Sequence, residues 1–198
     1  MPPNGSPISW QKWRECRGLA MDALLPPLMV YAACGLVLSL TVHILSFFGI
    51  ALGGTTLFMA LHIGIFPLWI PVVLIGQKMA GGGMRRGDFW KAALSGCPPW
   101  MKYMTYGFFA YAVANFVVFM FYAPVGQKTG ANVPATVVHG FSGHWMAFYS
   151  AGLAILTTAY RRGLSNLQRI CPFGHEVGWS DRFCPTCGAS IPPASDAP

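Results

Sequence analysis

The sequence predicts an all-α integral membrane protein with four transmembrane helices, followed by a small C-terminal module built around zinc. Three observations lead to this fold class. Apolar residues make up 54% of the 198 residues and charged residues only 10%, whereas soluble domains carry roughly 25% charged residues. Four apolar segments are each long enough to cross a bilayer, which takes about 20 residues. The chain then ends in the motif CPFGHEVGWSDRFCPTCG.

The membrane domain is predicted to occupy residues 21–165, and its first two spans cover about 26–48 and 57–76. Two prolines open the first span, at a position where proline loses no needed hydrogen bond. The second span contains Pro67 and Pro71. We therefore expect it to be kinked, with neighbouring helices satisfying the carbonyls that the prolines leave free.

The third and fourth spans are predicted at about 101–122 and 141–160. In the loop before the third span, the stretch DFWKAAL that begins at Asp88 is expected to form a short interfacial helix. Residues 1–20 form an N-terminal segment that lacks the apolar core of a cleavable signal peptide. Residues 166–191 form the zinc module, and residues 192–198 are expected to be a disordered tail.

The distribution of charge predicts the orientation. The basic clusters all fall on the side that the two termini share, at Lys12, Arg14, Arg17, Lys78, Arg85, Arg86, Lys91, Lys102, Arg161, Arg162 and Arg169. On the other side, Lys128 is the single charge. The positive-inside rule then places both termini in the cytoplasm, with the protein in the cytoplasmic (inner) membrane. Since the net charge of +7 is spread over clusters that flank apolar runs, no nucleic-acid partner is expected.

The C-terminal motif has the spacing of a structural zinc site. Cys171 and His175 are separated by three residues, and Cys184 and Cys187 by two. Zinc in structural sites takes four tetrahedral nitrogen or sulfur ligands, and two pairs carried on tight turns supply them. Such a shell leaves no open position, so the metal is expected to stabilise the fold and not to catalyse a reaction. Free thiols at this site also predict a reducing compartment, which agrees with the orientation.

The stretches CPFGH and FCPTCG together resemble the short zinc-ribbon modules that end many prokaryotic proteins. The resemblance covers about residues 170–191 and implies Cys171, His175, Cys184 and Cys187 as the ligands. A ribbon with a closed shell can act only through its surface. The side chains between the two ligand pairs that are expected to contact a partner are Trp179, Arg182 and Phe183.

The remaining histidines raise a second possibility. His43, His62 and His144 are predicted at similar depth near the outer face, on three different spans. Imidazoles so arranged could ligate haem or a second metal, or they could hydrogen-bond neighbouring helices. Both interpretations stay open at this point.

One further motif is the stretch GFSG at residues 140–143, which resembles the GxSG motif of rhomboid intramembrane proteases. The resemblance implies Ser142 as a nucleophile that a histidine from another span activates. Rhomboids have at least six spans, with the histidine on a later helix, and this chain has no span after the fourth. The alternative is that Ser142 caps the N-terminus of the fourth span.

These observations favour a membrane-anchored scaffold or adaptor that presents its zinc ribbon to a cytosolic or membrane protein partner, and not an enzyme. A haem- or metal-binding redox membrane protein is the alternative, and a rhomboid-like protease is a minor one. The six acidic residues all lie outside the predicted spans. Ion-coupled transport, which commonly uses carboxylates inside the membrane, is therefore disfavoured.

Overall fold

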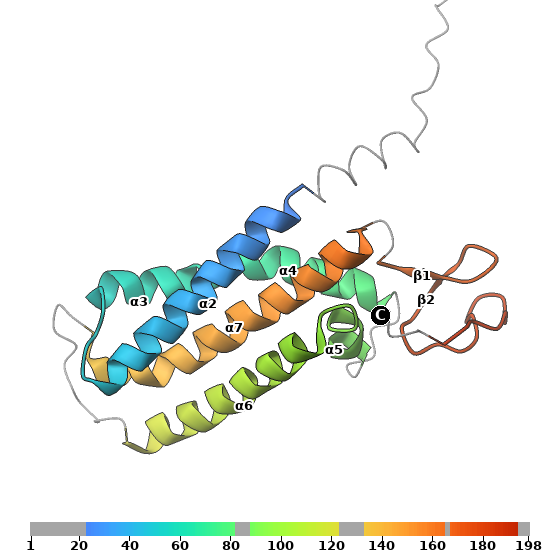
Figure 1. The fold of residues 1–198 in the computed structure, drawn as a ribbon. Coiled ribbons are helices and arrows are strands. Elements are labelled where there is room, and N and C mark those ends of the chain that lie inside the picture. The colour runs from blue at the N-terminus through green and yellow to red at the C-terminus, as the bar shows by residue number, and fades with distance from the viewer. Residues whose placement is uncertain (1–22, 82–87, 123–132, 165–166, 194–198) are drawn as a thin grey trace, which may run out of the picture.

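The computed structural model describes residues 23–81, 88–122, 133–164 and 167–193. The predictions for residues 1–20, for Arg85, Arg86 and Lys128, and for the last five residues lie outside these ranges. The described chain is mostly helical (Figure 1), with a small two-stranded element near the C-terminus. Three helical segments are long and apolar enough to cross a membrane: Leu25–Phe47, Gly54–Ala80 and Pro99–Tyr122.

The first of these segments is helix α2 (Leu25–Phe47), with proline in its first turn as predicted. Its apolar residues lie on all sides. Val37, for example, leaves 65% of its surface exposed, and the second and third segments expose Ile70 and Phe121 to 65% and 81%. Contiguous apolar surface of this kind is rare on soluble proteins. The outer faces of the three segments are thus suited to contact lipid.

The second segment is divided into α3 (Gly54–Ile63) and α4 (Ile65–Ala80), which meet at Gly64. Pro67 and Pro71 lie in α4 and cannot donate to the carbonyls one turn before them. Tyrosines from two other helices supply hydrogen bonds at the break. The hydroxyl of Tyr31 donates to the carbonyl of Gly64 at 2.8 Å, and that of Tyr149 donates to the carbonyl of Leu61 at 3.1 Å.

Helix α7 (Ala135–Arg162) lies between α2 and α6 (Pro99–Tyr122) and packs against both (Figure 1). It is 28 residues long, and more than half of its residues are buried. Small residues allow the close approach. A Cβ atom added to Gly143 would lie 3.1 Å from the Cα of Ala112 in α6, and one added to Gly152 would lie 2.9 Å from the side chain of Leu68 in α4. The core of the bundle is therefore centred on α7.

Two small elements complete the end of the bundle at which the chain leaves α7. Helix α5 (Asp88–Ala93) confirms the predicted short helix, and its residue Phe89 packs against Gly76 of α4. Beyond α7, strands β1 (Arg169–Ile170) and β2 (Glu176–Val177) pair antiparallel, with Arg169 opposite Val177. A second bridge joins Phe183 to Ser190. The module has a small buried cluster of its own, made of Cys171, Val177, Cys184 and Ile191.

Candidate metal centre and the polar cluster between the helices

The first pair of predicted metal ligands is carried by one tight turn. The amide of Gly174 donates to the carbonyl of Cys171 at 2.9 Å, and the amide of Cys171 donates to the carbonyl of His175 at 2.9 Å. Gly174 has a φ of 84°, which is a conformation that residues with a Cβ rarely adopt. The turn brings both side chains of the pair to the same side of the backbone.

The second pair repeats this arrangement. The amide of Gly188 donates to the carbonyl of Cys184, and the amide of Cys184 donates to the carbonyl of Ala189, both at 2.8 Å. Gly188 has a φ of 72°. Both glycines that the turns require can be recognised in the sequence. Gly174 lies between Cys171 and His175, and Gly188 directly follows Cys187.

The two turns face each other, so the four predicted ligands come together. One ligand atom from each of Cys171, His175, Cys184 and Cys187 lies within 4.8 Å of all the others. The Sγ atom of Cys171 lies 3.4 Å from Nδ1 of His175 and 3.7 Å from Sγ of Cys187. This group could hold a metal ion. Among the described residues it is the one cluster of three or more such side chains with this property.

The thiols of this cluster differ in acidity. Burial opposes the ionisation of Cys184, but the backbone amides of Cys187 and Thr186 and the neighbouring thiols outweigh it and lower the pKa of Cys184 to about 6. A hydrogen bond from the amide of Ala189 lowers the pKa of Cys187, but burial and the interactions with the thiols of Cys184 and Cys171 together outweigh it, so the pKa of Cys187 is raised. A thiolate at Cys184 is thus available to a metal ion at neutral pH.

The metal-binding module is held against the helical bundle by Trp179. The guanidinium of Arg162, at the end of α7, lies 4.8 Å from the centroid of the Trp179 ring, and that of Arg169 lies 6.0 Å from it. The amide of Trp179 donates to the carbonyl of Ala80 at the end of α4. Next to it, a Cβ atom on Gly81 would lie only 2.6 Å from the carbonyl oxygen of Val177.

The three residues predicted to contact a partner therefore differ in position. Trp179 faces the bundle, whereas Arg182 and Phe183 are exposed. Two further exposed apolar residues of the module, Ile170 and Phe173, escaped the sequence interpretation. The exposure of Phe173 could have been predicted from the sequence, because Phe173 lies between the two ligands of the first turn. The ligand atoms occupy the inner side of that turn, so the ring has to point outward.

The histidines predicted near the outer face fall into two separate pairs. The ring of His43 stacks on that of His139, with centroids 4.7 Å apart. The ring of His62 lies edge-on to that of His144, with centroids 5.1 Å apart. Of the three histidines predicted to share a site, the structure thus brings together His62 and His144 and places His43 with His139 instead.

Both nitrogen atoms of His43 have hydrogen-bond partners. Nε2 lies 2.7 Å from the hydroxyl of Tyr111 in α6, and Nδ1 lies 2.6 Å from the hydroxyl of Ser142 in α7. Since the Ser142 hydroxyl also donates to the carbonyl of His139 at 2.8 Å, one assignment satisfies every group. Tyr111 donates to His43, His43 donates to Ser142, and Ser142 donates to the backbone.

Other polar side chains extend this buried network. The hydroxyl of Ser46 lies 3.0 Å from Nδ1 of His139, and the amide of Asn115 donates to the carbonyl of His139 at 2.8 Å. In the second pair, the indole N–H of Trp145 donates to Nδ1 of His62 at 3.3 Å. These contacts link α2, α6 and α7, and α3 with α7. They are the interhelical hydrogen bonds that the second interpretation of the histidines predicted.

The expectation that Ser142 caps the fourth span is wrong. Helix α7 begins at Ala135, with Pro134 at its N-cap, so Ser142 lies two turns inside the helix. The residues before it continue the helix because Val138, Gly140 and the His139 carbonyl all pack or bond against neighbouring helices. Ser142 is fully buried.

No protein-family model, curated protein or solved structure matches this chain. The resemblance of residues 170–191 to zinc ribbons therefore depends on its motif and on the geometry of its ligand group. The function has to be inferred from the residues themselves.

Proposed function

We propose that the protein is a four-span membrane adaptor that presents a zinc-bound ribbon on the cytoplasmic side to a protein partner. Four features of the described residues support this proposal. They are the position of α7, the location of the basic residues, the spacing of the ligand atoms and the exposed apolar surface of the C-terminal module.

The position of α7 supports a fourth span. At 1.5 Å per residue, 28 residues extend about 42 Å, which exceeds a hydrocarbon core of about 30 Å. The helix is less apolar than the other three because its small and polar residues, among them Ser142, Ser150 and Thr158, are buried against other helices. A span that contacts protein needs fewer large apolar residues than one that contacts lipid.

The location of the basic residues supports a cytoplasmic ribbon. At the end of the bundle that carries the module, Lys78 donates to the carbonyl of Leu164 and Arg161 to that of Gly96, each at 3.1 Å. Lys91, Lys102 and Arg162 belong to the same end. The described residues at the opposite end include no lysine or arginine. The positive-inside rule then puts the module in the cytoplasm.

The spacing of the ligand atoms supports zinc. Around a tetrahedral zinc ion, two sulfur ligands lie about 3.8 Å apart, and a sulfur and a nitrogen lie about 3.6 Å apart. The corresponding distances here are 3.7 Å and 3.4 Å. Cys171, His175, Cys184 and Cys187 would hold the ion, and its binding energy would stabilise a module too small to fold on its own.

The exposed surface of the module is the observation that carries the adaptor proposal. Ile170, Phe173 and Phe183 leave 64%, 72% and 65% of their surfaces exposed. Burying one such side chain is favourable by about 1.5–3 kcal/mol, and three exposed large apolar side chains on one small module supply apolar area that a partner can bury. With a four-ligand shell the metal has no open position for substrate, so the surface is where the module can act.

Affinity purification from detergent-solubilised membranes tests the adaptor proposal. We expect the double variant Phe173→Ala/Phe183→Ala to lose proteins that the parent chain recovers, while it keeps its zinc content. The control is Phe121→Ala/Tyr122→Ala, which removes two rings that are also exposed, 81% each, at the end of α6 far from the module. If both variants recover the same proteins as the parent chain, and deletion of residues 166–198 changes nothing, the ribbon does not recruit a partner.

One contact favours a second candidate function, a Ser–His hydrolase within the membrane. The 2.6 Å separation between Ser142 Oγ and His43 Nδ1 suits a nucleophile and its base when His43 carries its proton on Nε2, which reverses the hydrogen-bond assignment given above. His43 would then accept the proton of Ser142 and donate to the hydroxyl of Tyr111, which would orient the imidazole. A fluorophosphonate probe applied in lipid nanodiscs would then label the parent chain, but neither Ser142→Ala nor His43→Gln. An unlabelled parent chain would leave the three residues with the structural role of joining their helices.

A further inference from the structure

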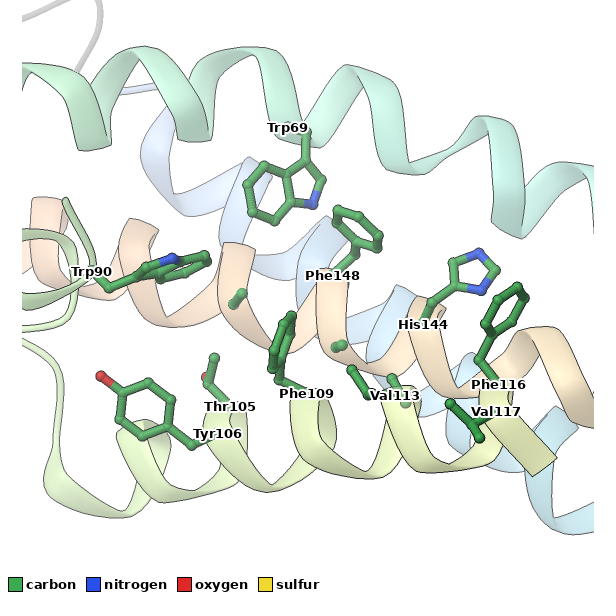
Figure 2. A pocket seen from close by; sticks show the side chains of 13 residues that line it. Trp69, Trp90, Thr105, Tyr106, Phe109, Val113, Phe116, Val117, His144 and Phe148 are labelled. Carbon is green, nitrogen blue, oxygen red and sulfur yellow. The ribbon is translucent and has the colours of Figure 1, made fainter. Parts of the chain in front are cut away.

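A cavity of about 510 Å³ separates α4 from α6 and has α7 as its floor (Figure 2). Its walls are one face of α6 from Thr105 to Val117, the side chains of His144, Ala147 and Phe148 on α7, and Trp69 of α4. Trp90 of α5 lies at the basic end. Its volume is typical of small-molecule sites, which measure about 300–1,000 Å³.

The cavity is long and narrow. Thr105 and Val117 are twelve residues apart in α6, so the cavity extends about 18 Å along the helices. This length is similar to one leaflet, because a hydrocarbon core measures about 30 Å in total. Dividing the volume by the length gives a mean cross-section of about 28 Å² for the centres of water-sized spheres, which is about 6 Å across, or about 9 Å from wall to wall.

These dimensions limit what can occupy the cavity. A helix from a second copy measures about 10–12 Å across with its side chains, which is too wide. A single hydrocarbon chain fits. Small residues create the space, since alanines at 112, 147 and 151 lie where larger side chains would fill it. The lining is almost wholly apolar, and it lies between two helical segments that are long and apolar enough to cross a bilayer.

Two residues that line the cavity each carry a buried polar atom without a partner, which indicates a ligand that is more than hydrocarbon. Among the described residues, Nε1 of Trp69 and Oγ1 of Thr105 are buried and have no hydrogen-bond partner. Both residues line the cavity, and Trp69 projects from α4 toward α6 and α7 (Figure 2). An indole N–H can only donate. A partner for it must therefore be an acceptor such as a carbonyl oxygen, and leaving such a donor unpaired is costly.

We propose that this cavity binds one membrane amphiphile through a single hydrocarbon chain, with a carbonyl oxygen of that molecule accepting hydrogen bonds from the wall. An ester carbonyl of a phospholipid and a ring carbonyl of an isoprenoid quinone share this chemistry. The proposal does not depend on the adaptor role of the C-terminal module.

Native mass spectrometry of the delipidated protein tests the proposal, with dipalmitoyl phosphatidylglycerol and decylubiquinone as separate probes. We expect one molecule of one probe to bind to the parent chain. Ala147→Phe places a ring in the cavity and should weaken binding at least tenfold, while Ala114→Phe should bind as the parent does. Ala114 is the matched control because it lies exposed on α6 and does not line the cavity.

Thr105→Val tests the hydrogen bond without changing the shape of the side chain. Loss of one neutral hydrogen bond should weaken binding about fivefold. This variant also tests the proposal in case Ala147→Phe does not fold. Binding of the phospholipid identifies an ester as the acceptor, and binding of the quinone identifies a ring carbonyl. The proposal is overturned if neither probe binds, if Ala147→Phe and Ala114→Phe bind equally, or if the parent chain is a dimer that Ala147→Phe dissociates.

Discussion

A substitution of His175 should affect zinc binding differently from a substitution of one of the three cysteines in its cluster. A shell of four cysteines is as ordinary for structural zinc as one of three cysteines and a histidine. We therefore expect His175→Cys to keep about one zinc per chain. Cys187→Ala should lose it, because three ligands leave the ion open to water and to chelators.

Elemental analysis after dialysis against a mild chelator checks this pair of variants. Cys97→Ser is the control, since Cys97 is a thiol buried outside the cluster. Retention of zinc by Cys187→Ala would show that this thiol is not a ligand.

The two histidine pairs lead to a different expectation at the residue scale. His43 uses both nitrogen atoms in hydrogen bonds, and Nδ1 of His62 accepts one from Trp145. A neutral imidazole that accepts at Nδ1 carries its proton on Nε2 and has no free lone pair. We expect the purified protein to contain about one zinc and no haem. A Soret band, or a second equivalent of metal that is lost in His144→Ala, would instead support the redox alternative.

Trp179 joins the module to the membrane domain, and its removal should separate the two. The ring is half-buried between the guanidinium of Arg162 and the bundle. We expect Trp179→Ala to destabilise this contact by about 1–3 kcal/mol, from lost burial and a lost cation–π interaction. Limited proteolysis should cleave the variant faster between α7 and β1, while its zinc content stays unchanged. Phe173→Ala, which removes an exposed ring, should be cleaved at the parent rate.

At the scale of the element, glycines on the helices are not equivalent. A side chain on Gly143 would meet the backbone of α6, whereas one on Gly107 would meet nothing within 4 Å. We expect Gly143→Leu to destabilise the bundle by about 1–3 kcal/mol through overpacking. Gly107→Leu should be neutral or stabilising by up to about 1 kcal/mol, because leucine is the better helix former. Thermal unfolding in one detergent would compare them, and equal midpoints would argue against the packing of α6 on α7.

Some elements could be predicted from sequence because composition alone determines them. Three of the predicted spans correspond to helical segments that the structure also finds apolar enough to cross a membrane, and the ligand cluster followed from local spacing. The start of α7 was missed because its first residues are only moderately apolar. What makes them helical there is contact with α2 and α6, which the sequence does not display.

The pairing of the histidines could not be predicted for a related reason. A helix that is apolar on all sides gives no sequence signal for which face meets its neighbours. In α2, the partners of His43 therefore stay unknown until the rotation of the helix is known. That rotation places His43 beside Ser142 and Tyr111. The ligand turns of the module need no such information, since their geometry depends on residues at most five apart.

At the scale of the whole molecule, the basic end of the bundle and the module should face the same compartment. We expect a membrane-impermeant maleimide added to intact cells to label Tyr122→Cys, because Tyr122 is exposed at the opposite end. Phe173→Cys should react only after the cells are permeabilised. Labelling above the parent background is the measurement. The reverse pattern would place the termini outside.

The contact of Trp179 with Ala80 and Arg162 has a consequence for assembly. The two residues belong to α4 and α7, which reach this end of the molecule from different parts of the chain. The module therefore has its fixed position only when α4 and α7 have already packed together. A protein that binds only the docked module would bind copies of this chain in which α4 and α7 are already packed, and not copies that are still folding. It would do so without contacting the membrane helices.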